Sequence, residues 1–494
     1  MPSFRRSRAI VRAVLPAFVV TVALLVGAAS PVAGASKPKA GFATFSLAST
    51  PPAPAGTVCP GGNGCSNGAA EPAIRAARDG AFYGSSENGL GAGTVAWKST
   101  DGGRHFSSLL SPNNVSATQD TGFAPGGGDT DLAVAPIRNA SGQYNVYVSS
   151  LTLADVDVST STDGGATWAL NPVAASVPGD DREWIAADDA SKVCVSYHDL
   201  AFNLWVNCSY DAGASFTQLA DAFDAAHAWL IDSNSTGNLA IDPASHTIYQ
   251  TFSGPADASG TVACGGFACL NTVYMAVSSD GGRTFTDHVV YVNPDQNVAY
   301  GHQFTNVSVD AAGNVYAVFS DNHNLYYAWS TNRGTTWSAP RRVNGSPSAT
   351  AIMPWSVAGA AGKIDVVWYG TSYYDGVNPP DNYPDSAAWY VYFAQNLDAA
   401  SPKGTFSQGA ATPIIHYGGV CLSGIACTGN RDLYDDFGVA ANPLTGLASI
   451  IYSDDQYRND ASNTPSGSCT PARSNTGSCD HTAVATQTAG KGIY

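Results

Sequence analysis

Apolar and polar residues alternate along most of this chain in short runs, and each run ends at glycine, asparagine or aspartate. One stretch shows the arrangement fully, with TNVSVD at 305–310, NVYAVFSD at 314–321, LYYAWS at 325–330 and APRRV at 339–343. Alternation with a period of two places side chains on opposite faces of a strand, and the intervening residues favour turns. The pattern therefore predicts four consecutive strands joined by tight connections.

One octapeptide recurs after such a strand, with the form Ser-x-Asp-x-Gly-x-x-aromatic. Its copies are STDGGRHF (99–106), STDGGATW (161–168), SYDAGASF (209–216), SSDGGRTF (278–285) and STNRGTTW (330–337). Asp or Asn at the third position can accept backbone N–H bonds, glycine supplies positive φ, and the final aromatic can fill the core. The third-position residues are therefore expected to be structural: Asp101, Asp163, Asp211, Asp280 and Asn332.

The octapeptide resembles the Asp-box, or bacterial neuraminidase repeat, which marks sialidase-like β-propellers. The resemblance covers most of the chain and implies an all-β fold of four-stranded antiparallel blades, with the octapeptide between the third and fourth strands. Seven units align, starting near Glu71, Asp129, Arg182, Asn238, Phe304, Met353 and Asp435. The sixth keeps a degenerate octapeptide (QNLDAASPKGTF), and the seventh has none. Sialidases have six blades; seven are favoured here, with six as the alternative.

The seventh unit lacks a fourth strand of its own. Its third strand is expected at 481–487 (HTAVATQ), and FATFSLAS at 42–49 could supply the missing one. Such pairing would close the ring and leave no open sheet edge. The chain is therefore divided into 36–70, an N-terminal segment with the closing strand, and 71–494, the propeller.

Residues 1–35 resemble a secretory signal peptide. Four arginines within 1–12 precede an apolar run at 13–29, and Ala-Gly-Ala at 33–35 provides a small-residue cleavage site. A membrane anchor is the alternative, which a proline inside the run disfavours, and Arg5-Arg6 leaves a twin-arginine route open. We expect a secreted, extracellular protein with no stable membrane span after cleavage.

Composition narrows the function further. Charged residues number 62 (23 basic plus 39 acidic), or 13%, which is about half of the usual share. Cleavage after residue 35 would change the net charge from −16 to 19 − 39 = −20. Such acidity argues against nucleic-acid binding, which needs basic patches. The 51 glycines and the 10% aromatic content exclude a coiled coil and a disordered chain.

Ten cysteines fall in near-neighbour pairs, which suits an exported protein with disulfides. The expected pairs are Cys59 with Cys65, Cys194 with Cys208, Cys264 with Cys269, Cys421 with Cys427, and Cys469 with Cys479. A zinc site is the rival interpretation, but no Cys-x-x-Cys or paired histidine spacing accompanies these residues.

Strand direction predicts where a site would lie. Neighbouring strands of a blade run in opposite directions, so the octapeptide turns after the third strands all lie on one face of the propeller. The starts of the first strands and the ends of the second strands lie on the opposite face, named here the rim. Glu71, Glu87 and Glu183, the only glutamates in the chain, all map to the rim, as do Asp435 and Asp436. The candidate substrate-binding residues are Arg182, Arg75, Arg431, Arg458, His198, Asp199, Asp321, Trp355 and Asp375.

The resemblance to sialidases implies a specific chemistry. Sialidases hold the substrate carboxylate with three arginines, whose forked donors bind it bidentately, and use a Tyr nucleophile assisted by Glu, with Asp as acid/base. The catalytic candidates are Tyr369, Tyr452, Glu183, Glu87, Asp129 and Asp131. The family's Phe/Tyr-Arg-Ile-Pro motif is absent; the corresponding strand has EPAIRAARDG, with Arg75 displaced.

No cofactor or metal site is predicted, because the phosphate-loop, zinc-helix and twelve-residue calcium-loop motifs are absent. The aspartate pairs 129/131, 435/436 and 454/455 leave a structural calcium ion open. Two functions follow: a secreted glycoside hydrolase of exo-sialidase type that acts on terminal acidic sugars of extracellular glycans, or a non-catalytic propeller that binds a glycan or cell-wall ligand. The acidic rim suits an anionic sugar only if the arginines converge.

Overall fold

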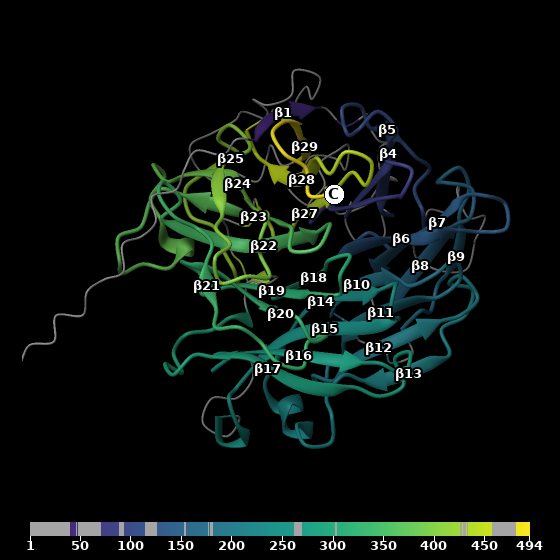
Figure 1. Ribbon diagram of the computed structural model, residues 1–494, viewed down its shortest axis with the longest axis horizontal. Helices are drawn as coiled ribbons and strands as arrows, with labels where there is room; N and C mark the ends of the chain where they lie inside the picture. The colour runs from purple at the N-terminus through teal and green to yellow at the C-terminus, as the bar shows by residue number, and fades with distance from the viewer. Residues whose placement is uncertain are drawn as a thin grey trace, which may run out of the picture. The chain divides into compact units, whose positions relative to one another are not determined.

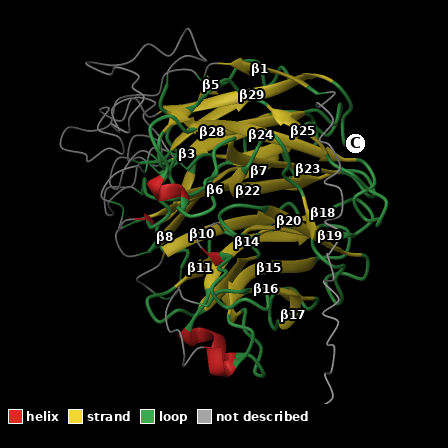
Figure 2. Cartoon of the chain, turned by 90° about the vertical axis from the view of Figure 1, so that its left-hand side faces the viewer, coloured by secondary structure: helices red, strands yellow, loops and turns green. Residues whose placement is uncertain are grey.

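The computed structural model describes residues 40–45, 47, 71–87, 93–113, 126–152, 155–175, 177, 181–260, 269–301, 304–424, 427, 431, 433–456 and 481–494. These residues belong to one compact unit, Gly34–Tyr494. They form strands, short 3-10 helices that include η2 (Ala228–Asp232) and η4 (Pro380–Asn382), and a helical stretch at 258–260 (Figures 1 and 2). No helix in these ranges is long and apolar enough to cross a membrane. The predicted signal segment lies outside them.

The strands form seven antiparallel sheets, the blades, which are numbered here in chain order. Blade 1 contains β2 (Ala73–Ala76), β3 (Phe82–Ser86), β4 (Val95–Ser99) and β5 (Ser107–Ser108). Blade 2 contains β6 (Thr130–Arg138), β7 (Tyr144–Leu151), β8 (Val156–Ser161) and β9 (Ala169–Asn171). Blade 3 contains β10 (Asp181–Ala187), β11 (Val193–His198), β12 (Leu204–Ser209) and β13 (Gln218–Asp221).

Blades 4 to 7 repeat the same order. Blade 4 contains β14 (Ser235–Asp242), β15 (Thr247–Gly254), β16 (Thr272–Ser278) and β17 (Thr286–Val292), and blade 5 contains β18 (Asn306–Val309), β19 (Val315–Ser320), β20 (Leu325–Ser330) and β21 (Arg341–Arg342). Blade 6 contains β22 (Thr350–Ala358), β23 (Ile364–Thr371), β24 (Ala388–Asn396) and β25 (Ser407–Ala410), and β26 (His416–Tyr417) also pairs with β24. Blade 7 contains β27 (Gly438–Ala441), β28 (Ala448–Asp454), β29 (His481–Ala489) and β1 (Gly41–Phe45).

The first strand of every blade lies at the centre. β2, β6, β10, β14, β18, β22 and β27 each contact the next in this order, and β27 contacts β2, so the ring is closed. This arrangement confirms the predicted all-β propeller and its seven blades. The predicted unit starts lie within three residues of the starts of these strands, and the difference is three residues at Asn238 (β14 begins at Ser235), Met353 (β22 begins at Thr350) and Asp435 (β27 begins at Gly438).

The N-terminal strand completes the last blade, as predicted. β1 pairs antiparallel with β29, with Thr44 opposite Ala485, and Figure 1 shows the purple N-terminal strand beside the yellow C-terminal one. The fourth strand of blade 7 thus comes from the opposite end of the sequence. Blade 7 is therefore built from both ends of the described chain.

Burial changes from the second strand to the fourth strand of each blade. Every residue of β15 and of β23 is buried, which suits their Tyr-, Phe-, Trp-, Val- and Thr-rich sequences. Three of the outer strands, β5, β9 and β21, have only two or three residues, and all of these residues are exposed or intermediate. Short outer strands limit the exposed sheet edge and hence the risk of edge-to-edge association.

The octapeptides form the turns between third and fourth strands. In the copy at 161–168, the Ser161 hydroxyl donates to Asp163 Oδ1 (2.8 Å), while the backbone N–H groups of Ala166 and Thr167 donate to the same oxygen (3.0 and 2.9 Å). The Gly165 N–H donates to Ser161 Oγ (2.7 Å). The other four copies repeat these main contacts around Asp101, Asp211, Asp280 and Asn332.

The glycine at the fifth octapeptide position also joins neighbouring blades. Gly165 has a φ of 94°, and a Cβ there would lie 2.8 Å from Leu109 of blade 1. A Cβ on Gly213 would lie 2.6 Å from Thr160 of blade 2, and one on Gly103 would lie 2.8 Å from Thr486 of blade 7. Each of these octapeptides therefore packs against the preceding blade, and the glycine is required both for its positive φ and for this close approach.

The described disulfides agree with the predicted pairs. Cys194 and Cys208 are bonded across the neighbouring strands β11 and β12, and Cys421 is bonded to Cys427. Cys269 is also disulfide-bonded, while its expected partner Cys264 lies outside the described residues.

Two of the predicted disulfides fall on parts of the chain that the structure does not describe. One is the pair of Cys59 with Cys65, and the other is the pair of Cys469 with Cys479. All four of these cysteines lie outside the described ranges, so both pairings stay predictions from their spacing in the sequence.

Candidate functional site

The inner strands begin with irregular backbone at the rim. Glu71, Arg182 and Met353 have positive φ values of 46°, 49° and 52°, although none is a glycine. The register of β10 shifts between Asp181 and Trp184, as at a β-bulge. A bulge redirects the side chains of a strand, and residues held in the left-handed region concentrate at functional sites. This local geometry turns Arg182 and its neighbours toward one another.

Arg182 lies at the centre of a buried ion-pair network. Its Nη1 lies 3.4 Å from Glu71 Oε2 and 3.6 Å from Asp129 Oδ2, and its Nη2 contacts Asp436 Oδ2. The guanidinium carbon lies 4.1 Å from the centre of the Trp184 ring. Blades 1, 2, 3 and 7 are therefore joined at one guanidinium.

Two further arginines lie near this network. Arg431 Nη2 lies 3.2 Å from Glu71 Oε1 and 2.6 Å from Asp435 Oδ2, so it shares Glu71 with Arg182. Arg75 Nη2 lies 2.7 Å from Asp131 Oδ1, and its guanidinium carbon lies 5.1 Å from the Trp355 ring centre. Arg182 and Arg431 thus converge on one carboxylate, whereas Arg75 is held by a different one. All three form ion pairs within the chain.

Carboxyl groups outnumber arginines here, and burial changes their acidity. Desolvation, followed by the charge of Asp129, raises the pKa of Glu87 to about 8 and also raises the pKa of Glu71. Desolvation likewise raises the pKa of Asp436 to about 7 against the attraction of Arg182, and that of Asp181 to about 6. Several of these groups therefore retain protons at neutral pH.

Glu183 is the most isolated member of the group. Neither of its carboxyl oxygens has a hydrogen-bond partner among the described residues, and the residue is fully buried in β10. Desolvation and the neighbouring Asp129 raise its pKa well above the usual value. A neutral carboxylic acid is the form that such surroundings favour.

Three of the carboxylates are close enough to be considered as cation ligands. Single oxygens of Glu71, Glu87 and Asp129 lie within 4.8 Å of one another. However, Arg182 contacts both Glu71 and Asp129, and Arg431 contacts Glu71. Two guanidinium groups therefore already supply positive charge to these oxygens. The structural calcium ion that the sequence left open stays a prediction.

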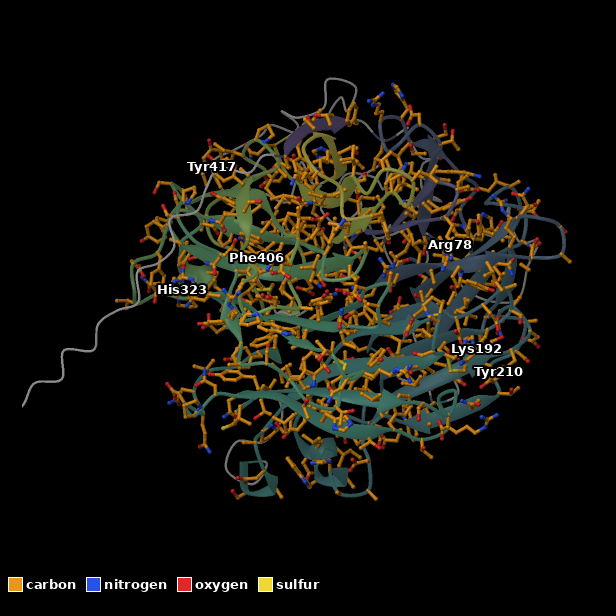
Figure 3. The ribbon with its side chains drawn as sticks, in the orientation of Figure 1. Arg78, Lys192, Tyr210, His323, Phe406 and Tyr417 are labelled. Atoms are coloured by element: carbon orange, nitrogen blue, oxygen red, sulfur yellow. A yellow bond between two sulfur atoms is a disulfide. The ribbon has the colours of Figure 1, made fainter. Side chains whose placement is uncertain are left out.

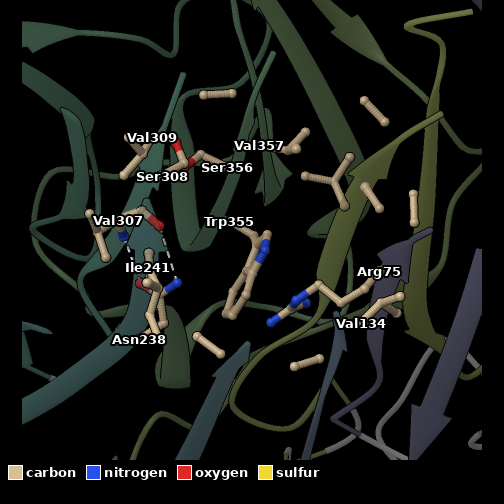
Figure 4. Close-up of a pocket in the computed structure, with 18 of the residues that line it drawn as sticks. Arg75, Val134, Asn238, Ile241, Val307, Ser308, Val309, Trp355, Ser356 and Val357 are labelled. Carbon is tan, nitrogen blue, oxygen red and sulfur yellow. Dashed lines mark hydrogen bonds between the residues drawn. The ribbon is translucent and has the colours of Figure 1, made fainter. Parts of the chain in front are cut away.

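The inner strands also enclose a cavity of about 270 Å³ (Figure 4). Most of the residues that line it are apolar, such as Ile185, Ile241 and Val357, whereas Arg75 and Trp355 contribute larger polar and aromatic groups. Tyr494 lines it as well, and together with Arg78, labelled in Figure 3, it also lines a neighbouring cavity of about 380 Å³. Trp355 packs against Trp184 at 5.2 Å between ring centres, which connects the cavity wall to the Arg182 network.

The predicted nucleophiles lie in the protein interior. Tyr369 in β23 is fully buried, stacks on Phe437 at 4.1 Å, and accepts a hydrogen bond from the Ser453 N–H (2.9 Å). Desolvation strongly raises its pKa. Tyr452 in β28 is also fully buried and belongs to the same hydrophobic cluster as Tyr369. Both tyrosines serve as packing residues between blades in this structure.

Four predicted rim residues have local structural contacts. His198 Nε2 pairs with Asn234 Oδ1 (2.9 Å), and Asp199 accepts from the Trp205 indole (2.8 Å). Asp321 accepts from the Asn324 N–H (2.6 Å), and Asp375 accepts from the Asn378 N–H (2.9 Å). Within the described ranges, the ion pairs of the rim arginines involve other carboxylates than these. Arg458 lies outside the described residues.

The structure brings together Arg182, Arg431, Asp129 and Glu87 from the predicted set, with Arg75, Asp131, Glu183 and Trp355 beside them. It adds Asp181, which the sequence analysis did not single out. The run Asp-Asp-Arg-Glu at 180–183 is the signal that could have identified it. Glu71 and Asp436, noted only as rim residues, contact Arg182 directly.

No family model matches this chain, and no curated protein matches it. Among solved structures it is similar to an α-L-arabinofuranosidase from Fusarium graminearum (TM-score 0.42, 17% identity, 61% of this chain and 88% of that chain). It is also similar to an α-L-arabinanase from Penicillium chrysogenum (0.43, 12%, 90% and 97%) and a xyloglucanase from Xanthomonas campestris (0.46, 13%, 83% and 54%). At such identities the likeness concerns the fold alone, and no residue role is transferred from it.

Proposed function

We propose that this protein is a secreted glycoside hydrolase that acts on extracellular glycans through the carboxyl cluster at the rim. The observation that carries the proposal is the pair Glu87 and Asp129, which have oxygens within 4.8 Å of each other in unlike surroundings. Glu87 is buried with a pKa of about 8, whereas Asp129 lies 3.6 Å from the Arg182 guanidinium. A carboxylic acid that can donate a proton, with a second carboxyl group close beside it, is what glycoside hydrolysis requires.

In this mechanism the protonated Glu87 donates its proton to the leaving-group oxygen. Asp129, whose side chain is 18% exposed, then stabilises the developing positive charge on the sugar ring or attacks it. Retaining enzymes place the two carboxyl groups about 5–5.5 Å apart, and inverting enzymes about 6.5–9.5 Å apart. The short Glu87–Asp129 separation favours the retaining course. The partly exposed Arg431 and Asp435 are positioned to bind sugar hydroxyl groups.

The charges favour a neutral sugar over a sialoside. A sialidase needs arginines that can bind the substrate carboxylate. Arg182, Arg431 and Arg75 are each paired with the chain's own carboxylates. An anionic sugar would have to compete with these carboxylates and approach an acidic rim. An exo-sialidase therefore remains the less favoured form of the proposal.

The test is hydrolysis of a panel of aryl glycosides that includes neutral furanosides, neutral pyranosides and a sialoside. We expect turnover of a neutral member and a loss of about 10²–10⁴-fold in kcat for Glu87→Gln, because general acid catalysis contributes that much. The rate should fall as pH rises through about 8, where Glu87 loses its proton. The octapeptide variant Asp163→Asn should keep full activity. Unchanged kcat in Glu87→Gln would contradict the assignment.

A non-catalytic glycan-binding propeller is the second candidate. The burial of Glu71, Glu87 and Glu183 favours it, because such groups contact a ligand less readily than exposed ones. The same glycosides would then bind without turnover, and binding would respond to substitution of the partly exposed Arg431 more than to Glu87→Gln. Calorimetric titration with oligosaccharides separates the two candidates.

A further inference from the structure

A second group of ionisable side chains lies far from the rim cluster in sequence, at the junction of blades 3 and 4. Asp224 and His227 belong to the linker between β13 and η2, and Asp287 is the second residue of β17. Asp224 and His227 are partly buried, and the side chain of Asp287 is fully buried. The group therefore connects an inter-blade linker to the outermost strand of the next blade.

The three side chains converge closely. His227 Nδ1 lies 2.9 Å from Asp224 Oδ1 and 3.6 Å from Asp287 Oδ2, and one ligand atom from each residue lies within 4.8 Å of the others. Tetrahedral zinc with bonds of about 2.1 Å places its ligand atoms about 3.4 Å apart. The observed distances need only small side-chain adjustments to reach that geometry.

The hydrogen bonds of the group leave one buried oxygen unsatisfied. The Asp224 N–H donates to Asp287 Oδ2 (2.9 Å), and the Asp287 N–H donates to Asp224 Oδ2 (3.0 Å). This reciprocal pair explains how the two carboxylates are held side by side. It does not satisfy Asp287 Oδ1, which is buried and has no hydrogen-bond partner among the described residues.

The negative charge of the group is also uncompensated. In the described part of the chain, Asp224 and Asp287 form ion pairs only with His227, and neither contacts a lysine or an arginine. A buried carboxylate with a free oxygen beside an imidazole needs either a proton or a cation.

We propose that Asp224, His227 and Asp287 form a binding site for a zinc-class divalent cation. One imidazole nitrogen and two carboxylate oxygens suit zinc or a similar transition metal, whereas calcium takes oxygen ligands only. The cation would hold the 222–234 linker against blade 4, in the same manner as the disulfides hold neighbouring segments.

The experiment is a zinc titration of the full-length protein after removal of metals with a chelator. We expect one zinc ion per chain, together with a rise in Tm on zinc addition. The variants His227→Gln and Asp287→Asn should each weaken zinc affinity by about 100-fold or more. His246→Gln is the matched control, because His246 Nδ1 also pairs with an aspartate, Asp188, at 2.7 Å but without a second carboxylate.

Cobalt absorption provides a measurement that does not depend on the variants folding. Co²⁺ bound to wild-type protein by nitrogen and oxygen ligands should give visible d–d bands, which zinc should abolish in equimolar amount. The proposal is overturned if neither ion binds to the wild-type protein. It is equally overturned if calcium binds in preference to zinc, or if His227→Gln and His246→Gln bind zinc equally well.

Discussion

At the scale of single residues, the octapeptide aspartate is the clearest case of a side chain that fixes the backbone. Asp163 accepts hydrogen bonds from the Ser161 hydroxyl, from the Ala166 and Thr167 N–H groups and from the Thr167 hydroxyl. These bonds replace the strand pairing that the chain loses as it reverses direction. Such side-chain bonding to nearby backbone is the reason that Asp and Asn dominate turns.

Two replacements of Asp163 should show how much its hydrogen bonds contribute to stability. Asp163→Ala removes all four bonds, and we expect a loss of about 1–2 kcal/mol in the free energy of unfolding, comparable to the loss of a helix cap. Asp163→Asn should cost far less, because Asn332 occupies the same position in another copy and accepts the Thr336 N–H at 3.0 Å. Urea denaturation of the three proteins measures the difference; equal stability of the Ala variant and wild type would contradict the argument.

Asp157 in β8 provides a residue-scale prediction about pH. Desolvation raises its pKa to about 8, although Asn113 Nδ2 donates to both of its oxygens (3.4 and 3.3 Å). The folded state therefore keeps a proton that the unfolded chain loses near pH 4, so stability should fall as pH rises from about 4 to about 8. Asp157→Asn, which imitates the protonated acid, should reduce this slope.

The measurement is Tm against pH for wild type and Asp157→Asn. Between about pH 5 and about pH 8, the Tm of the variant should rise relative to that of wild type by a few degrees. In a chain of this size, a change of about 1 kcal/mol in the free energy of unfolding shifts Tm by roughly 2–4 °C or less. Asp375→Asn is the control, because Asp375 lies in an exposed turn and its pKa is lowered by the Asn378 and Val377 N–H groups. Parallel curves for wild type and Asp157→Asn would refute the assignment.

At the scale of elements, sequence patterning predicted the blades but not the shape of the inner strands. Alternation and the octapeptide identified the strand order because both depend on local chemistry. The bulge in β10 and the positive φ of Arg182 and Met353 depend instead on packing around the central ring, and no glycine marks them. The contact between Arg182 and Asp436, 254 positions apart, could not be inferred from either pattern.

The difference between local sequence patterns and packing between blades also explains which candidate site residues the structure brings together. Arg182 and Asp129 were predicted because they begin inner strands, and all inner strands begin at the same end of the ring. Tyr369 and Tyr452 were predicted from the tyrosine nucleophile of sialidases and from their position at the ends of second strands. A strand end can nevertheless point a side chain into the core between two blades as easily as toward solvent. Which of these occurs depends on the face of the sheet that the neighbouring blade covers.

At the scale of the whole ring, stability depends on every blade having two neighbours. Octapeptide glycines pack on the preceding blade, and Arg182 joins residues of four blades. Blade 7 has a fourth strand only because β1 pairs with β29. Phe42 of β1 also packs on Phe393 of blade 6, with 4.9 Å between ring centres. The closing strand therefore supports two blades at once.

A chain that begins at residue 48 should show what this closure contributes. Removal of β1 leaves the β29 edge unpaired, and we expect a Tm lower by about 5 °C or more, together with concentration-dependent association through that edge. A chain that begins at residue 36 is the matched control, because it loses only the segment predicted to be a signal peptide and keeps β1. Calorimetry and sedimentation at several concentrations make the comparison. If both truncated chains melt at the same temperature and stay monomeric, the β1–β29 pairing does not hold the ring together.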